Sequence, residues 1–293
     1  MGCPAASGPD GCPARAAMTE LVFDRPAAVG ARPLVSLRRV GKRFANGVEA
    51  LSDVDLSVIE GEFLSLLGPS GCGKSTVLRI VAGLAEPSGG AVEWPRLPHD
   101  AAGRPERAIG FVFQEPTLMP WATVRANVWL PLRLKGVGKA AARPQIDEML
   151  ALVGLSGFAE AYPRELSGGM KMRVSIARAL VTRPPLLLMD EPFAALDEIT
   201  RQKLNDDLLA IKARLGTTVV FVTHSVYESA YLSTRIAVMA ARPGRVLREI
   251  EVPAPVPRGE GFRAGTLYTD VCHETSAALQ DAIAAAGAAG GRR

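Results

Sequence analysis

The chain has 293 residues, of which 48% are hydrophobic and 22% charged, and its formal net charge is +4. This composition is typical of a folded globular protein, and no run of Lys and Arg interleaved with aromatic residues points to a nucleic-acid partner. No stretch approaches the roughly 18 uninterrupted apolar residues of a membrane span, so any membrane role must be exercised through a partner.

The first thirty residues are rich in Pro, Gly and Ala and show no hydrophobic periodicity. They also lack the continuous apolar region that a signal peptide requires. We therefore expect residues 1–33 to form a disordered extension, and Met18 is an alternative translation start.

From residue 34 the pattern becomes strand-rich, with predicted strands at 35–40, 54–60 and 62–67. The third strand ends at a loop with the pattern G-x-x-x-x-G-K-[ST], and a helix is predicted at 76–84. The loop residues are Gly68, Pro69, Ser70, Gly71, Cys72, Gly73, Lys74, Ser75 and Thr76. Backbone N–H groups in such a loop, together with the helix N-terminus, favour a bound phosphate.

This phosphate loop predicts binding of a nucleoside triphosphate. Lys74 is expected to reach the β- and γ-phosphates, and the Ser75 hydroxyl is expected to hold Mg²⁺. A Gly-rich turn that binds nothing is the alternative, which the flanking strand and helix disfavour. Cys72 is either a small spacer, which we favour, or a thiol whose pKa is lowered by the helix N-terminus, so that it is alkylated when no nucleotide is bound.

The rest of the chain alternates between strands and helices, which implies a largely parallel sheet covered on both faces. The pattern is helical from about 123 to 161, and residues 115–182 are read as a helical insertion. Strands are predicted at 91–94, 109–113, 186–189, 218–223 and 236–239, and helices at 168–181, 198–215, 226–232 and about 266–285.

The apolar strand at 186–189 runs directly into two acids, Asp190 and Glu191. Carboxylates at the carboxyl end of a buried strand lie where ligands bind in open α/β sheets. Asp190 is expected to orient Mg²⁺ through its water shell, and Glu191 to polarise the attacking water as general base. The pair alone would equally well open a turn before Pro192, but the phosphate loop upstream favours the catalytic interpretation.

Ser167, Gly168 and Gly169 open the helix at 168–181 and form a second phosphate-binding surface. Two such surfaces, about ninety residues apart, are hard to satisfy with one nucleotide in one chain. The sequence therefore predicts a head-to-tail homodimer. Each ATP would lie between the phosphate loop of one subunit and the Ser-Gly-Gly segment of the other.

With these motifs the chain resembles the ATP-binding subunits of ABC transporters from residue 35 to about residue 245. The resemblance implies an α/β fold, a P-loop NTPase of the ABC type, with a parallel-rich core sheet, an antiparallel N-terminal β part and a helical insertion. It places this nucleotide-binding domain at 34–250, with the helical subdomain at about 115–182. Residues 251–293 would then form a Pro-rich linker and a C-terminal helix.

The resemblance also assigns roles to residues of three further motifs. Gln114 would join the γ-phosphate and the metal to the helical insertion, and His224 would contact the γ-phosphate. Asp197 would align the opposing subunits, and Phe44 would stack on adenine. The structural alternatives are a polar residue at a strand end for Gln114, a capping or core role for His224, and a core aromatic for Phe44.

Four segments, 114–121, 123–128, 223–235 and 240–244, look like those of the nitrate/sulfonate/taurine group of bacterial importers. That group also contains carriers of pyrimidine-type vitamin precursors. In that group the ATPase pairs with a separate integral-membrane permease and a periplasmic or extracytoplasmic solute-binding protein. This implies a peripheral position on the cytoplasmic face of the inner membrane. The apolar segment 118–121 is either a docking surface for the permease or local packing within the insertion.

Two residues depart from the common family pattern, Met172 and Ser225, without removing a phosphate or metal ligand. Other function classes are ABC ATPases that act on DNA or ribosomes, and plain P-loop kinases. The former carry long coiled coils or two nucleotide domains, whereas this chain has no sustained heptads and one phosphate loop. A kinase would leave Ser167 and its two glycines unexplained. The sequence therefore favours ATP hydrolysis coupled to transport.

Overall fold

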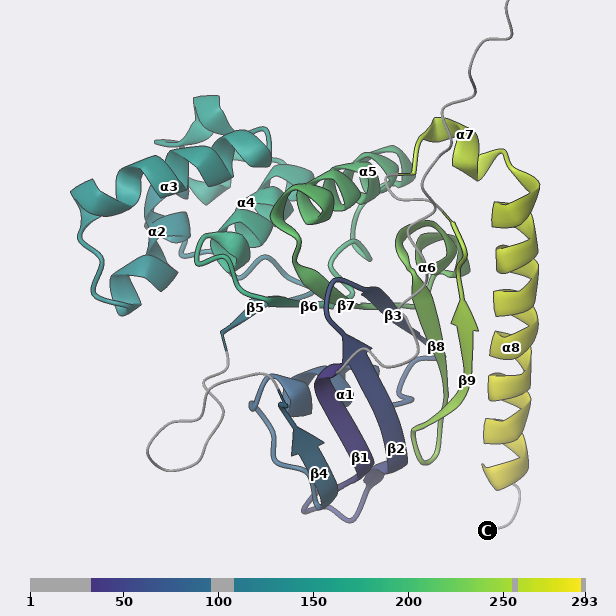
Figure 1. Ribbon diagram of the computed structural model, residues 1–293. Coiled ribbons are helices and arrows are strands. Elements are labelled where there is room, and N and C mark those ends of the chain that lie inside the picture. Colours follow the sequence, from purple (N-terminus) through teal and green to yellow (C-terminus); the bar gives the residue numbers. More distant parts are fainter. Residues whose placement is uncertain (1–32, 96–107, 255–257, 291–293) are drawn as a thin grey trace, which may run out of the picture.

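The computed structural model describes residues 33–95, 108–254 and 258–290. The predicted disordered extension, including Met18, lies outside these residues except for Pro33, and so do residues 255–257 of the Pro-rich stretch at 252–257. Figure 1 shows two sheets, a helical region on one side and a long C-terminal helix on the other. Within the described ranges, none of the helices combines the length and the apolar character that crossing a membrane requires.

The smaller sheet is antiparallel and has the strand order β2-β1-β4. Its strands are β1 (Pro33–Arg43), β2 (Glu49–Ile59) and β4 (Gly89–Glu93). β1 and β2 are longer than the predicted strands. Their pairing continues beyond the irregular positions, where the register shifts, as far as Arg43 and Glu49. Arg39 and Asp53, with φ of 47° and 48°, mark two of these irregular positions.

The larger sheet has the strand order β5-β6-β7-β3-β8-β9. β5 (Ile109–Val112), β6 (Leu186–Asp190), β7 (Thr218–Thr223), β3 (Phe63–Leu67) and β8 (Arg235–Ala240) run parallel, and β9 (Arg245–Glu251) is antiparallel to β8. Every residue of β3, β6 and β7 is buried, as expected for the central strands of a sheet covered on both faces.

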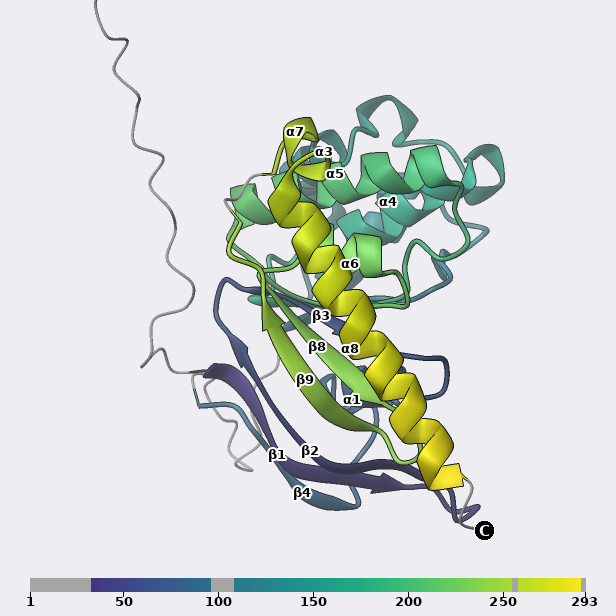
Figure 2. The same cartoon turned by 90° about the vertical axis from the view of Figure 1, so that its right-hand side faces the viewer.

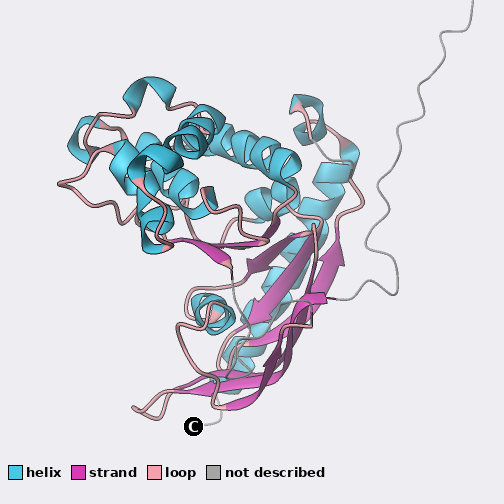
Figure 3. Cartoon of the chain, turned by 60° about the vertical axis from the view of Figure 1, so that its left-hand side comes forward, coloured by secondary structure: helices cyan, strands magenta, loops and turns pink. Residues whose placement is uncertain are grey.

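Each face of this core sheet has its own apolar layer. On one face, α1 (Lys74–Val81) lies between the core sheet and the antiparallel sheet, in one cluster with residues such as Leu37, Leu78 and Val222. The other cluster joins the core sheet to α4 (Gly168–Leu180), α5 (Glu198–Leu215) and α6 (Val226–Leu232). Figure 3 shows most helices gathered on one side of the sheet and the antiparallel strands on the other. The predicted fold class is confirmed.

The chain between β5 and β6, where the insertion was predicted at about 115–182, is helical and projects from the core. It contains α2 (Val124–Leu134), α3 (Lys139–Leu152), the 3-10 turns η1 (Ser156–Phe158) and η2 (Pro163–Glu165), and α4. Buried side chains of α2, α3 and α4, among them Val128, Ile146 and Val174, belong to a single apolar cluster. Because α4 also packs on β5, this region is anchored to the core sheet by its last helix.

Two elements near the C-terminus were not predicted, β9 and α7 (Glu260–Arg263). β9 is an edge strand of mostly exposed, charged residues, so it gives no apolar alternation, and α7 is only four residues long. The C-terminal helix α8 (Thr266–Gly290) extends beyond the predicted end. It packs along β8 and against α6, as Figure 2 shows.

Candidate active site

The phosphate loop connects β3 to α1, at the carboxyl edge of the core sheet. Gly73 caps α1 with a left-handed φ of 94°, which glycine adopts without steric cost. A Cβ on Gly73 would lie 2.5 Å from Cδ2 of Leu51 in β2, so the antiparallel sheet leaves no room for a side chain here. The helix begins at Lys74, two residues earlier than predicted. The backbone of the first helical turn therefore fixes the direction in which the Lys74 side chain leaves the chain.

The Lys74 side chain curls back over the loop and is only 4% exposed. Its Nζ donates hydrogen bonds to the carbonyl oxygens of Gly68 (2.8 Å) and Pro69 (3.1 Å) and lies 3.9 Å from Glu191 Oε1. A buried ammonium needs several acceptors to offset its lost hydration. The loop thus holds one fixed positive charge at its centre, where a phosphate would add further acceptors.

Ser75 and Asp190 bring two oxygen ligands together from α1 and β6. The Ser75 hydroxyl donates a 2.7 Å hydrogen bond to Asp190 Oδ1. Burial raises the pKa of Asp190, and the Ser75 hydrogen bond partly opposes that rise. A hydroxyl and a carboxylate are oxygen donors of the kind that Mg²⁺ takes from a protein alongside substrate phosphates. No group of three or more His, Cys, Asp or Glu side chains in the described ranges forms a metal cage of its own.

Glu191 and His224 meet because β6 and β7 are parallel neighbours, with Asp190 opposite Val222. Glu191 has a φ of 46°, which is strained for a residue other than glycine, and its N–H donates to the Val222 carbonyl oxygen (3.1 Å). Glu191 Oε2 lies 3.2 Å from His224 Nδ1. The His224 side chain is 56% exposed, so the alternative of a core histidine is wrong.

Gln114 lies two residues beyond the end of β5. Val112 of β5 pairs with Met189 of β6, so the chain carrying Gln114 leaves the sheet beside Asp190 and Glu191. The Gln114 side chain is exposed. Topology therefore brings Gln114 to the same edge of the sheet as the phosphate loop, the two acids and His224.

Ser167, Gly168, Gly169 and Asp197 form a separate group. Ser167 Oγ accepts a hydrogen bond from the Met170 N–H (3.3 Å), so this side chain caps α4. Cβ atoms on Gly168 and Gly169 would lie 3.5 Å from Leu196 and 2.8 Å from Thr200, which places the start of α4 against the start of α5.

Asp197 caps α5 by accepting a 2.9 Å hydrogen bond from the Thr200 N–H, and hydrogen bonding to Thr200 lowers the pKa of Asp197. Ser167, Gly168 and Asp197 are all exposed. The structure thus joins these two motifs to each other and leaves their polar surface open.

Phe44 lies in a turn directly after β1, where its N–H donates to the Val48 carbonyl oxygen (2.9 Å). The ring is 43% exposed, and Lys42 Nζ lies 5.6 Å from its centroid. The alternative of a core aromatic is therefore wrong. Contact of Phe44 with adenine stays a prediction.

Cys72 is fully buried beneath the phosphate loop, with an exposed fraction of 0%. A Cβ on Gly68 would lie 2.8 Å from Cys72 Sγ, so the sulfur fills the space under the loop. Burial raises the pKa of the Cys72 thiol more than the nearby Lys74 lowers it. The interpretation as an activated, alkylatable thiol is therefore wrong, and Cys72 acts as a packing residue.

The two departures from the family pattern have structural explanations. Met172 is 2% exposed and packs in the apolar cluster beneath α4. Ser225 caps α6 by accepting a hydrogen bond from the Glu228 N–H (3.3 Å). Both residues therefore support the elements that carry the predicted site.

Sequence reasoning missed the contacts that fix the turn carrying His224. Thr223 Oγ1 donates a 2.5 Å hydrogen bond to Glu228 Oε2 and accepts one from the Ser225 N–H (3.0 Å). Glu228 is 8% exposed, and burial raises its pKa. A single Glu in a short helix is usually a solvent-facing residue, so no sequence signal distinguished it.

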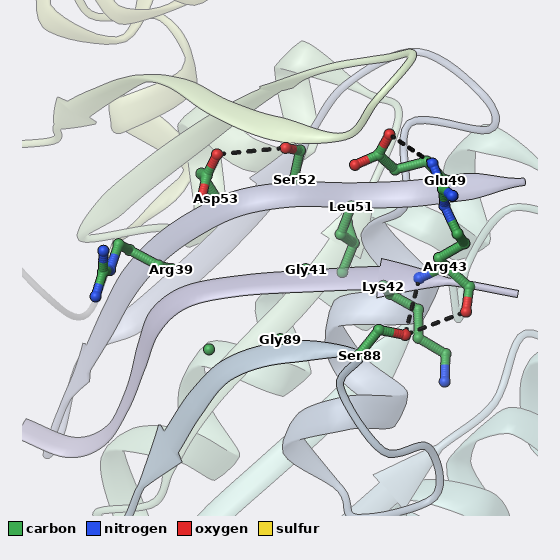
Figure 4. A pocket seen from close by; sticks show the side chains of 11 residues that line it. Arg39, Gly41, Lys42, Arg43, Glu49, Leu51, Ser52, Asp53, Ser88 and Gly89 are labelled. Carbon is green, nitrogen blue, oxygen red and sulfur yellow. Dashed lines mark hydrogen bonds and ion pairs between the residues drawn. The ribbon is translucent and has the colours of Figure 1, made fainter.

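A hollow of about 430 Å³ lies away from these residues, on the antiparallel sheet (Figure 4). Its lining includes Arg39, Arg43 and Asp53, and the figure shows Arg43 beside Ser88. None of the phosphate-loop residues, Gln114, Asp190, Glu191 or His224 lines it. This hollow therefore does not mark the candidate site, which we identify from the convergence of charged groups at the edge of the core sheet.

The chain is similar to known proteins over most of its length. Residues 51–194, which run from β2 through the phosphate loop to just beyond Glu191, match the ABC transporter family. An aliphatic sulfonates import ATP-binding protein of Pseudomonas savastanoi is 47% identical over 77% of this chain and 88% of that protein. The chain belongs to the family of ABC transporter ATP-binding proteins.

Two further relatives are similar to this ABC ATPase over most of its length. An aliphatic sulfonates import ATP-binding protein of Bacillus licheniformis is 45% identical over 76% of this chain and 87% of that protein. A solved ATP-binding cassette, described as dimeric in a post-hydrolysis state with ADP and Pi, is 37% identical, with a TM-score of 0.65, and covers 77% of this chain and 99% of its own. The prediction that this chain is an ABC transporter ATPase is thus confirmed.

Proposed function

We propose that this ABC ATPase drives a bacterial importer as a homodimer, with ATP and Mg²⁺ bound between the two subunits. The observation that carries the proposal is the convergence of Lys74, Ser75, Asp190, Glu191 and His224 on one edge of the core sheet. These are the charges and donors that an ATP-hydrolysing site needs: a phosphate cation, metal-binding oxygens, a base and a group for the γ-phosphate.

Each of these residues has a separate role in the proposed hydrolysis. Lys74 and the backbone N–H groups of the loop, which Pro69 lacks, would hold the β- and γ-phosphates. Ser75 and Asp190 would hold Mg²⁺, which supplies charge neutralisation when bound. Glu191 takes a proton from the attacking water, and His224 contacts the γ-phosphate. The left-handed backbone of Glu191 aims its carboxylate toward Lys74 and His224 rather than along the strand.

The second half of each nucleotide site is supplied by the partner subunit. Ser167 and Gly168 are exposed at the start of α4, so their N–H groups are free to face a phosphate from another subunit. Asp197 lies beside them and would align the two subunits. The dimeric state of the solved relative with ADP and Pi supports this arrangement.

The permease would dock near Trp121, whose side chain is 77% exposed. Leu118 packs against the apolar cluster and therefore fits local packing within the insertion. Trp121 is exposed and fits a docking surface for the permease. Asn127 holds the loop: its Oδ1 accepts from the Met119 N–H (2.8 Å), and its Nδ2 donates to the carbonyl oxygens of Met119, Ala122 and Thr123. Trp121 is therefore presented on a fixed loop, as expected of a residue that anchors a partner.

The names of the relatives favour an organic sulfonate as the transported solute, within the wider class of nitrate, sulfonate, taurine or a related small solute. A pyrimidine-type vitamin precursor is the alternative, and a non-transport role on nucleic acid or ribosomes is the least favoured. The permease and an extracytoplasmic solute-binding protein would complete the importer at the cytoplasmic face of the inner membrane.

The experiment is to reconstitute the purified ATPase with its permease in liposomes and to add the solute-binding protein loaded with methanesulfonate, taurine, nitrate or a pyrimidine. We expect Mg²⁺-dependent ATP hydrolysis that rises with one loaded form, together with uptake of that solute. Failure to associate with the permease, or salt-sensitive binding to DNA or ribosomes, would contradict the transport role.

A further inference from the structure

Gln114 lies on a short span that is attached to α4 on both sides. Before it, β5 approaches α4 so closely that a Cβ on Gly110 would lie 2.7 Å from the Ala179 carbonyl oxygen. After it, residues Pro116 and Thr117 are hydrogen-bonded to Arg178 of the same helix. The freedom of Gln114 is therefore limited by one helix, although Gln114 precedes that helix by more than fifty residues.

Arg178 makes three hydrogen bonds to this loop. Its Nη1 donates to the Thr117 carbonyl oxygen (2.8 Å), and its Nη2 donates to the Pro116 carbonyl oxygen and to Thr117 Oγ1 (2.9 Å each). Burial lowers the pKa of Arg178, and all three acceptors are uncharged. A guanidinium is suited to this task because its planar donors fix several acceptors at once.

The backbone at Thr117 needs such support. Its φ is 47°, in the left-handed region that β-branched residues rarely adopt. Strained conformations persist where the surrounding structure over-determines them, and here Arg178 binds both the carbonyl and the hydroxyl of the strained residue. The shape of the loop after Gln114 thus depends on this side chain.

α4 also carries Ser167 at its other end. Arg178 lies eleven residues after Ser167, a distance of roughly 16 Å along the helix at 1.5 Å per residue. A packed helix moves as a rigid element, so a displacement at its start reaches its last turn.

We infer that Arg178 is a positioning residue: it holds Gln114 in place at the nucleotide site of its own subunit and links it to the end of α4 that faces the partner's nucleotide. The inference rests on the proposed roles of Gln114 and Ser167. The hydrogen bonds of Arg178 go to Pro116 and Thr117 and not to the residues proposed to hold the phosphates or the metal, so we expect its effect to pass through Gln114.

The test is a double-mutant cycle on the full-length protein with Arg178→Met and Gln114→Ala, measured as kcat and KM for Mg·ATP. Arg178→Lys tests rescue, because an ammonium donates to some of the same oxygens. Arg143→Met is the matched control, since the Arg143 side chain is 70% exposed and lies 3.7 Å from Asp147 in an i,i+4 pair. Thermal denaturation checks that each variant is folded.

We expect Arg178→Met to lower kcat on the order of 10- to 100-fold with little change in KM, as a small misplacement of a reacting-site group does. In the Gln114→Ala background the same substitution should cost less than about twofold, because the two residues act as one unit. Arg178→Lys should recover part of kcat, and Arg143→Met should behave as the parent.

Three results would overturn the inference, and they separate its failure from that of the proposed function. If Gln114→Ala leaves kcat unchanged, the proposed role of Gln114 is wrong, and the inference fails with it. If Gln114→Ala lowers kcat but Arg178→Met does not, only the role of Arg178 is wrong. If the two losses multiply independently, Arg178 acts elsewhere than through Gln114.

Discussion

Replacing Glu191 by Gln removes one negative charge and leaves the shape of the site unchanged. In the structure the carboxylate has two charged or polar neighbours, Lys74 Nζ at 3.9 Å and His224 Nδ1 at 3.2 Å. A glutamine amide can still bond to His224 but cannot take a proton from water. Loss of a general base costs about 10²- to 10⁴-fold in rate, which corresponds to about 3–5 kcal/mol of barrier.

Nucleotide binding should respond in the opposite way to Glu191→Gln. Lys74 loses a competing anion and keeps its carbonyl partners Gly68 and Pro69, so it remains available to phosphate. We therefore expect ATP affinity to be unchanged or tighter, and a dimer with uncleaved ATP to accumulate.

The assay for Glu191→Gln is phosphate release at saturating Mg·ATP, together with size-exclusion chromatography with and without ATP. Glu93→Gln is the matched control, because the Glu93 side chain is 54% exposed on β4 and pairs weakly with Arg38 at 3.6 Å. Hydrolysis by Glu191→Gln within about threefold of the parent would refute the assignment of the base.

Three further predictions concern single residues of the same site. The peptide containing Cys72 should resist maleimide in the folded protein with or without ATP, since the thiol is buried and its pKa raised; rapid labelling that ATP suppresses, seen by mass spectrometry, would contradict this. Because burial raises the pKa of Asp190 and the metal needs its charged form, the apparent Mg²⁺ affinity should fall as pH is lowered through that pKa. Asp190→Asn should lose this part of the pH dependence, and equal profiles in titrations of both proteins would count against the metal role. Gly73→Ala should cost about 1–3 kcal/mol of folding stability and weaken ATP binding, given the φ of 94° and the contact with Leu51; unchanged thermal denaturation and nucleotide titration would show that the loop tolerates a side chain.

The part of the site built on regular strands and helices was predictable from sequence. An apolar run followed by a Gly-rich loop, or by two acids, fixes which residues leave the sheet at its carboxyl edge, and a parallel sheet then brings them together. Lys74, Ser75, Asp190 and Glu191 meet for this reason. Gln114 and His224 were assigned by the family resemblance, and they lie just beyond the ends of β5 and β7.

What could not be predicted depends on side-chain contacts between distant segments. The sequence does not show that Arg178 reaches Thr117, or that Thr223 binds a buried Glu228, because neither pair has a local spacing rule. Cys72 was ambiguous for a related reason: its position next to a helix start favours a reactive thiol, while its burial, which decides its pKa, depends on the sheet packed beneath it.

The central claim is that each nucleotide site is shared between two subunits, and mixing two inactive variants tests it most directly. Lys74→Ala damages the phosphate loop, and Ser167→Arg blocks the surface offered to the partner's nucleotide. Each variant alone should be folded but inactive. In a head-to-tail dimer of one variant with the other, one site keeps both halves intact, so an equal mixture should regain roughly a quarter of the parent activity per subunit. Activity that stays absent although mixed dimers are detected by native mass spectrometry, or full activity of Ser167→Arg at any dilution, would contradict the account.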